Sequence, residues 1–143
     1  MLLEPDERDA DPGALRRRLA TQGRHGSFDL VAADPQTPEP ELVGWLAVEV
    51  LPWRRAAHVG TVVLGADAEH HGRGLGGALL EACHGEAVRR GPGRPELTVM
   101  VDNLCAVGLY LRHGYQVEGL RRGALLRDQG YVDEYFMVRP VGR

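Results

Sequence analysis

Apolar residues in the first half of the chain gather in short runs that predict β-strands. The predicted strands cover residues 27–33, 42–51 and 58–64. The proline-rich stretch 35–40 separates the first two, because proline has no N–H to donate to a neighbouring strand. The short connection before the third strand predicts antiparallel pairing with the second. Ahead of all three, Leu15 and Leu19 lie one helical turn apart and predict a short helix over 14–20.

Helix and strand patterns alternate in the second half. The longest helix is predicted over residues 75–90, and Gly91-Pro92-Gly93 ends it. Its apolar stripe is predicted to consist of Leu75, Ala78, Leu79, Ala82 and Cys83. A strand with two-residue alternation follows over 97–101.

A second, shorter helix is predicted after this strand. Asp102 and Asn103 are residue types that cap helix N-termini, and Gly114 is typical of a helix C-terminus. The inward face of this helix is predicted to carry Ala106, Leu109, Tyr110 and His113.

The C-terminal tail predicts a hairpin of two strands, 115–126 and 131–139, joined by Asp128-Gln129-Gly130. The long helix crosses over between strands 58–64 and 97–101, so this junction is parallel, whereas both ends of the sheet are antiparallel. These features predict an α/β fold with a mixed, largely antiparallel sheet flanked by helices.

The composition is that of an ordinary globular protein. The 143 residues have room for one domain with a sizeable core, and 43% of them are hydrophobic and 26% charged. A net charge of −3 disfavours a general affinity for nucleic acid or for an acidic membrane surface. Neither a secretory signal nor an apolar run of about 20 residues is visible, so we expect a cytoplasmic protein.

The cysteines and histidines do not have metal-binding spacing. Cys83 and Cys105 fall inside predicted helices, and we expect both to be small core residues in a reducing compartment. Cys105 has no evident base near it in the sequence, which argues against a cysteine nucleophile. His70-His71 lacks a third ligand at zinc spacing, so no metal is expected.

A glycine cluster, Gly72-Arg73-Gly74-Leu75-Gly76-Gly77, leads directly into the long helix. Glycines at a helix N-terminus let the backbone approach an anion, which the first-turn N–H groups and the helix dipole then face. Arg73 adds positive charge. The cluster matches the G-x-G-x-x-G fingerprint of dinucleotide-binding proteins and also the G-x-G-x-G loop that holds the pyrophosphate of coenzyme A. A sharp corner with no ligand is the simpler alternative.

The surrounding chain argues against a dinucleotide. In that fold the first glycine follows its strand almost directly, whereas residues 65–71 separate the predicted strand from Gly72 here. A second strand–helix–strand half is also missing from the predicted order. Asp102 does lie past the following strand, where a ribose-binding acid is found, so a nicotinamide-dependent oxidoreductase stays open as an alternative.

Two segments resemble the GNAT superfamily of N-acyltransferases. Val63-Leu64 through His71-Gly72-Arg73-Gly74-Leu75-Gly76-Gly77-Ala78-Leu79-Leu80 is similar to the superfamily's acetyl-CoA-binding segment. The second segment comprises Leu97-Thr98-Val99-Met100-Val101, Asn103, Ala106, Leu109-Tyr110, His113-Gly114-Tyr115 and Gly119. The ending 130–137 is similar as well. The resemblance covers a core of residues 42–139 and leaves 1–41 as a short variable part of one domain, 1–143.

The resemblance implies acetyl-CoA as cosubstrate. The main chain of Val62, Val63 and Leu64 is expected to pair with the pantetheine arm, and the N–H of Leu64 to polarise the thioester carbonyl. The amides of the glycine cluster are expected to hold the pyrophosphate, and Asn103 to hydrogen-bond the cofactor arm. The cofactor-binding residues implied are Val62, Val63, Leu64, His71, Gly72, Arg73, Gly74, Leu75, Gly76, Gly77, Asn103 and Ala106.

The resemblance also makes Tyr110 the expected general acid for the departing thiolate, although periodicity alone describes it as an inward core tyrosine. Glu49 and His58 are the two candidates for a base acting through water. The simpler interpretation of Glu49 is a surface acid at a strand end, and that of His58 is a structural histidine.

Two further observations concern the acceptor and the departures of the chain from the family pattern. Asp133 and Glu134 are candidates for attracting a cationic acceptor, although charges on a hairpin are more often a solvated face. The chain departs from the family at His71, where Arg or Gln is usual, and near Thr61, where many members have an acid.

The sequence thus predicts an N-acetyltransferase that moves acetyl from acetyl-CoA to a primary amine by direct attack. The expected acceptor is a small, amino-acid-like molecule, with a protein N-terminus or lysine left open. A non-catalytic CoA-binding module of the same fold is the other open interpretation. No nucleic-acid or membrane partner is expected, and the C-terminal strands are candidates for pairing in a homodimer.

Overall fold

The computed structural model describes residues 26–34, 36, 38–39, 41–66, 72 and 74–140. The predicted helix over 14–20 lies outside these residues, and so do His71 and Arg73.

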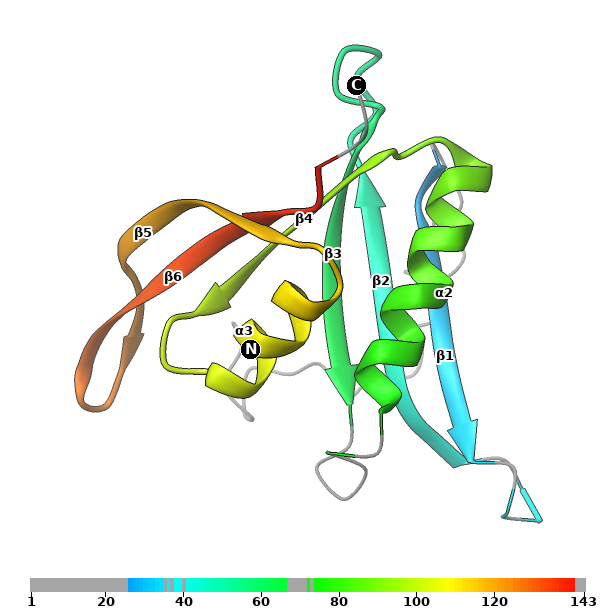
Figure 1. The fold of residues 1–143 in the computed structure, drawn as a ribbon, viewed down its shortest axis with the longest axis horizontal. Helices are drawn as coiled ribbons and strands as arrows, with labels where there is room; N and C mark the ends of the chain where they lie inside the picture. The colour runs from blue at the N-terminus through cyan, green and yellow to red at the C-terminus, as the bar shows by residue number, and fades with distance from the viewer. Residues whose placement is uncertain are drawn as a thin grey trace.

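The described elements build one six-stranded sheet that carries helices (Figure 1). In chain order the elements are β1 (Phe28–Asp34), β2 (Glu41–Val50), β3 (Val59–Ala66), α2 (Leu75–Arg90), β4 (Arg94–Met100), α3 (Leu104–Arg112), β5 (Gln116–Arg127) and β6 (Gly130–Val138). The strands lie side by side in the order β1-β2-β3-β4-β6-β5. Among these described strands, β3 and β4 pair in parallel and every other neighbouring pair is antiparallel. The predicted mixed, largely antiparallel α/β fold is confirmed.

Two strands are longer than the sequence predicted. Strand β4 begins at Arg94 rather than at 97, because Pro95 is tolerated at the beginning of a strand, where it pairs with Gly60. Strand β3 continues past 64 to Ala66, because its pairing with β2 runs that far. The loop before the glycine cluster is therefore shorter than predicted.

Helix α2 has the predicted bounds but buries a different stripe. Its buried residues are Leu79, Leu80, Cys83 and Ala87. The predicted Ala78 and Ala82 are exposed, because the helix is turned so that Leu80, with its larger apolar surface, faces the sheet. Neither α2 nor any other described helix is long and apolar enough to cross a membrane.

The two cysteines differ in their surroundings. Cys83 is buried in α2, as predicted, and burial raises the pKa of its thiol to about 12. Cys105 is exposed in the first turn of α3, so the prediction that it is a core residue was wrong. A helix this short buries only one side, and Cys105 lies on the other.

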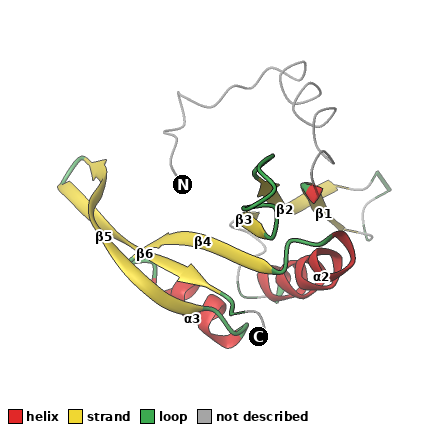
Figure 2. Ribbon diagram, turned by 90° about the horizontal axis from the view of Figure 1, so that it is seen from above, coloured by secondary structure: helices red, strands yellow, loops and turns green. Residues whose placement is uncertain are grey.

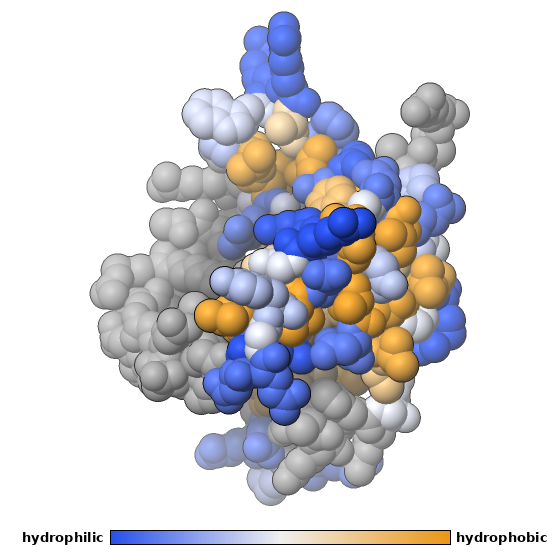
Figure 3. Space-filling model, turned by 90° about the vertical axis from the view of Figure 1, so that its left-hand side faces the viewer, coloured by the Kyte–Doolittle hydropathy of each residue, from blue (hydrophilic) through white to orange (hydrophobic). Residues whose placement is uncertain are grey.

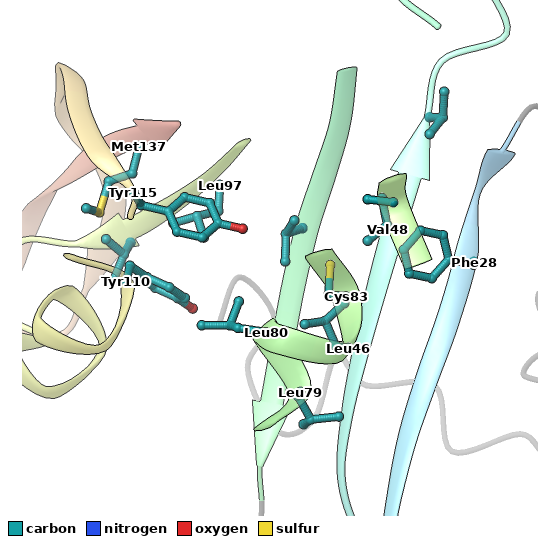
Figure 4. Packing of buried hydrophobic residues seen from close by; sticks show 14 residues of the cluster. Phe28, Leu46, Val48, Leu79, Leu80, Cys83, Leu97, Tyr110, Tyr115 and Met137 are labelled. Carbon is teal, nitrogen blue, oxygen red and sulfur yellow. The ribbon is translucent and has the colours of Figure 1, made fainter. Parts of the chain in front are cut away.

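Helices α2 and α3 lie on the same face of the sheet (Figure 2). Between them and the strands is one hydrophobic core, part of which Figure 4 shows. It consists of Phe28, Leu46, Val48, Val50, Val62, Leu79, Leu80, Cys83, Ala87, Leu97, Val99, Tyr110, Tyr115 and Met137. Because both halves of the sheet contribute to this core, it fixes the position of α3 relative to α2 and β3.

Strands β3 and β4 stay paired over a short stretch. Their register consists of Val59–Arg94, Gly60–Pro95 and Thr61–Glu96. Beyond these positions the two strands diverge (Figure 1). The edge of β3 from Val62 to Ala66 therefore has no neighbouring strand among the described residues on the side of β4.

Strands β5 and β6 form the predicted hairpin, with Asp128 and Gln129 between them. Strand β5 is the last of the sheet, so its outer edge has no partner strand among the described residues. Figure 3 looks at this end of the molecule and shows apolar side chains among polar ones. The exposed apolar residues of α3 and β5 include Leu104, Leu111, Val117 and Leu120. The homodimer through these strands stays a prediction.

Candidate functional site

The N-terminus of α2 presents backbone amides that have no partner among the described residues. Gly74 is the N-cap residue, no side chain caps the helix, and its first turn contains no acidic residue. The N–H of Ala78 donates to the carbonyl oxygen of Gly74, and this bond opens the helical ladder. The N–H groups of residues 75–77 thus have no partner among the described residues. Together with the positive end of the helix dipole, they suit an anion.

Gly72 and Gly74 shape the approach to these amides. Their φ angles are +77° and +78°, in the left-handed region that favours glycine. A Cβ built on either residue would meet nothing within 4 Å. These two glycines are therefore required by backbone conformation, and the space beside the amides is open.

Gly76 and Gly77 lie at a contact between helices. A Cβ on Gly76 would come within 2.8 Å of Cδ2 of Leu109, and one on Gly77 within 3.2 Å of the imidazole of His113. The absence of side chains at both positions brings α3 close to the beginning of α2. Their N–H groups nevertheless belong to the first turn of α2, so their role in holding the cofactor stays a prediction.

The predicted cofactor strand lies along the edge of β3 that β4 does not cover. Val62 is buried and Leu64 is half-buried on the side that faces α2, whereas Val63 is exposed on the opposite side. The backbone of all three follows the edge that β4 leaves at Thr61. Such an edge can accept an extended chain through main-chain hydrogen bonds.

Tyr110 is a buried residue of α3, with 8% of its surface exposed. Its side chain points from α3 toward Leu80 of α2 (Figure 4), and its hydroxyl has no hydrogen-bond partner among the described residues. Burial raises the pKa of this phenol. The hydroxyl therefore carries its proton at neutral pH, as a general acid must.

Asn103 caps α3, as predicted. Its Oδ1 accepts a hydrogen bond from the N–H of Ala106 at 3.2 Å. Asp102 does not share this role, because its carboxylate accepts from Arg127. The side-chain amide group of Asn103 is the part that remains for the predicted contact with the cofactor arm.

The structure separates the two predicted bases. Glu49 pairs in register with Thr61, the last residue before the strands diverge, and its side chain is exposed on the sheet face opposite α2. His58 precedes β3 at the closed end of the strand pair, where its carbonyl oxygen accepts from the N–H of Arg94. At about 3.3 Å per residue, His58 lies roughly 13 Å along the strand from Val62. Glu49 is thus nearer to the divergence.

The two acids of the hairpin have partners within it. Oδ1 of Asp133 accepts from the N–H of Gly123 at 2.8 Å. Glu134 is 4% exposed, and its Oε2 accepts from Nη1 of Arg121 at 3.0 Å. Both contacts stabilise the pairing of β5 with β6, and the predicted attraction of an acceptor stays a prediction.

The contacts of Tyr115 with Tyr110 and with His84 were not predicted from the sequence. The ring of Tyr115 meets that of Tyr110 edge to face, with 5.7 Å between the centroids. The hydroxyl of Tyr115 lies 3.2 Å from Nε2 of His84. The sequence signal for it was that His84 directly follows Cys83, a residue of the predicted apolar stripe.

The comparison with known families decides what kind of protein this is. The model of the acetyltransferase (GNAT) family matches residues 2–115. The chain belongs to the GNAT family. A relative of the chain is the L-amino acid N-acetyltransferase AaaT of Escherichia coli K12, which is 35% identical over 103 residues. The alignment covers 69% of this chain and 62% of the relative, so the chain spans less than two thirds of that protein.

Solved GNAT structures share the fold. A GCN5-related N-acetyltransferase from Kribbella flavida is 26% identical, with a TM-score of 0.82 over 99% of this chain and 82% of that one. A phosphinothricin acetyltransferase from Sinorhizobium meliloti, solved in complex with AcCoA, is 21% identical, with a TM-score of 0.82 over 95% and 72% of the two chains. The GNAT sheet, largely antiparallel, differs from the doubly wound parallel sheet of dinucleotide-binding enzymes, so the oxidoreductase alternative loses its structural basis.

Proposed function

We propose that this GNAT chain is an acetyl-CoA-dependent N-acetyltransferase that acts on the primary amine of a small, amino-acid-like molecule. One juxtaposition carries the proposal. The diverging edge of β3, the first-turn amides of α2 and the protonated hydroxyl of Tyr110 belong to elements packed around one core. A cofactor with an anionic pyrophosphate, an extended amide-containing arm and a thiolate leaving group fits these three features in that order.

The cofactor is held mainly by backbone groups. The N–H groups of residues 75–77 bind the pyrophosphate, and the conformations of Gly72 and Gly74 leave room for it. The pantetheine arm lies along β3 from Val62 to Leu64, as another strand would. The AcCoA bound to the Sinorhizobium meliloti enzyme, which has this fold, supports the choice of cofactor. His71 and Arg73 add to the pyrophosphate site in the sequence-based prediction.

Acetyl transfer proceeds by direct attack. The amine nitrogen bonds to the thioester carbonyl carbon while the N–H of Leu64 stabilises the oxyanion. When the carbon–sulfur bond breaks, Tyr110 gives its proton to the departing thiolate. Glu49 takes the proton of the amine through water, and it is preferred to His58 because it lies beside the divergence of the strands.

The acceptor approaches from the side opposite the helices. The helices α2 and α3 occupy one face of the sheet, and Glu49 and Thr61 lie on the opposite face, from which we expect the amine to approach. A carboxylate there favours a cationic amine. The name of the Escherichia coli relative, an L-amino acid N-acetyltransferase, supports an amino-acid acceptor.

Calorimetric titration with acetyl-CoA, beside NADH and NADPH, tests the cofactor assignment. Binding of acetyl-CoA alone is the expected result, and binding of a nicotinamide cofactor without acetyl-CoA would overturn the proposal. A panel of amines, followed by thiol release, then tests catalysis. Tight binding without turnover of any amine would favour a non-catalytic CoA-binding module.

A further inference from the structure

Tyr115, which is buried, and His84, which is half-buried, form a pair beside Tyr110. Tyr115 has 1% of its surface exposed, and its ring packs edge to face on that of Tyr110. On its other side, the rings of His84 and Tyr115 have their centroids 5.7 Å apart, and the Tyr115 hydroxyl lies within hydrogen-bond distance of Nε2. In Figure 4 the side chains of both tyrosines point toward α2. A continuous series of contacts therefore joins α2 to Tyr110.

The protonation states favour a definite hydrogen bond within this pair. Burial, together with the positive charge of Arg139 and the neighbouring His113, lowers the pKa of His84 to about 4. At neutral pH the imidazole is thus uncharged and has one nitrogen without a proton. Burial raises the pKa of Tyr115 well above its usual range, so its hydroxyl keeps a proton to donate. With the imidazole proton on Nδ1, the hydroxyl of Tyr115 donates to Nε2 of His84.

We propose that His84 and Tyr115 are positioning residues for Tyr110. This rests on the proposed function, in which Tyr110 is the general acid. His84 anchors the hydroxyl of Tyr115, the ring of Tyr115 packs against the ring of Tyr110, and the Tyr110 hydroxyl is thereby kept in one orientation for the thiolate. Neither His84 nor Tyr115 touches the reacting atoms.

Three variants of α2 test this positioning role. His84→Leu places an apolar side chain in this half-buried position and removes the hydrogen-bond acceptor. His84→Gln retains a polar group near the position of Nε2. Ala87→Gly, one turn along the buried stripe of α2, loosens the helix while it leaves the side chains of His84 and Tyr115 unchanged, and it is the matched control.

A spectroscopic test needs no turnover. In protein labelled with ¹³C in its tyrosine rings, the Tyr110 signal is identified by its loss in Tyr110→Phe. We expect this signal to shift or broaden in His84→Leu and to keep its position in His84→Gln and Ala87→Gly. An unchanged Tyr110 signal in His84→Leu would overturn the positioning role, whether or not the protein acetylates amines.

A kinetic test separates positioning from general loosening of the structure. His84→Leu is expected to lower kcat about fivefold with KM for acetyl-CoA unchanged, because misplacement of a reacting group slows chemistry more than binding. His84→Gln restores kcat. In a Tyr110→Phe background, His84→Leu gives no further loss, since the acid it positions is gone. An equal loss in both backgrounds would contradict the proposal. If Tyr110→Phe alone leaves kcat unchanged, Tyr110 is not the general acid, whatever the effect of His84→Leu.

Discussion

Gly77 of α2 packs directly against the imidazole of His113 at the end of α3. A Cβ on Gly77 would lie 3.2 Å from both Cε1 and Nε2 of that ring. The ring is held in place, because its Nδ1 donates to the carbonyl oxygen of Leu109 at 2.9 Å. The spacing between the beginning of α2 and α3, the helix that carries Tyr110, thus depends on the absence of a side chain at Gly77.

Gly77→Val is expected to lower the free energy of unfolding by about 1–3 kcal/mol, because the added methyl groups force the two helices apart. Urea denaturation measures this change. The control is Gly85→Ala in the same helix, where a Cβ would meet nothing within 4 Å. That substitution should stabilise the protein by about 0.5–1 kcal/mol. Wild-type stability of Gly77→Val would show that the helices are not in close contact here.

Gly74→Val is expected to weaken acetyl-CoA binding roughly tenfold or more. A side chain in the left-handed region costs about 1–2 kcal/mol, and this one would project into the space beside the α2 amides. Calorimetry gives the dissociation constant.

The matched variant for this loss of affinity is Gly91→Ala, at the other end of α2. Gly91 also has a positive φ, +111°, and open space around it. The Gly91→Ala variant should be less stable than the wild type and bind acetyl-CoA with unchanged affinity. If the wild type, Gly74→Val and Gly91→Ala bound acetyl-CoA with equal affinity, the pyrophosphate would have to bind elsewhere.

Tyr110→Phe is expected to lower kcat roughly 100-fold and to leave KM for acetyl-CoA nearly unchanged, because the lost hydroxyl acts only when the thiolate departs. Burial raises the pKa of Tyr110, so the wild-type kcat should stay level through neutral pH and fall only above the usual range of tyrosine. This alkaline decline should vanish in the variant. A pH–rate profile that is the same in both proteins would remove Tyr110 from the chemistry.

Stability is expected to fall as the pH drops from about 6.5 to about 4. The pKa of His84 is about 4 in the folded protein, against 6.5 for an ordinary histidine, so the unfolded chain binds a proton that the folded one does not. The free energy of unfolding therefore decreases with falling pH in this window, by on the order of 2 kcal/mol for a partly buried group. Urea denaturation at pH 7, 6 and 5 measures the slope. A slope in His84→Gln as steep as in the wild type would exclude His84 as its source.

The features that local chemistry dictates were predictable from the sequence. Helix α2 has its predicted bounds, because glycines delimit it at both ends. Asn103 caps α3, because a short polar side chain can accept from the free N–H of Ala106. The start of β4 was predicted too late, since it depends on pairing with β3, which is a contact between distant parts of the chain.

In the candidate site, too, local features were predictable and contacts between distant parts of the chain were not. The sequence presented the glycine cluster as one unit, whereas the structure gives Gly72 and Gly74 a conformational role and places Gly76 and Gly77 at a helix contact. The hydrogen bond between His84 and Tyr115 could not be predicted. It depends on how α2 is turned against the sheet, and a 3.6-residue period leaves that rotation open.

The most direct measurement of the proposed function is CoA thiol release from acetyl-CoA in the presence of single amino acids and other amines, with mass spectrometry of the products. The proposed function predicts an N-acetylated amine formed in step with free thiol, at a rate that falls in Tyr110→Phe. Acetyl-CoA that stays intact in the bound state with every amine offered would contradict it.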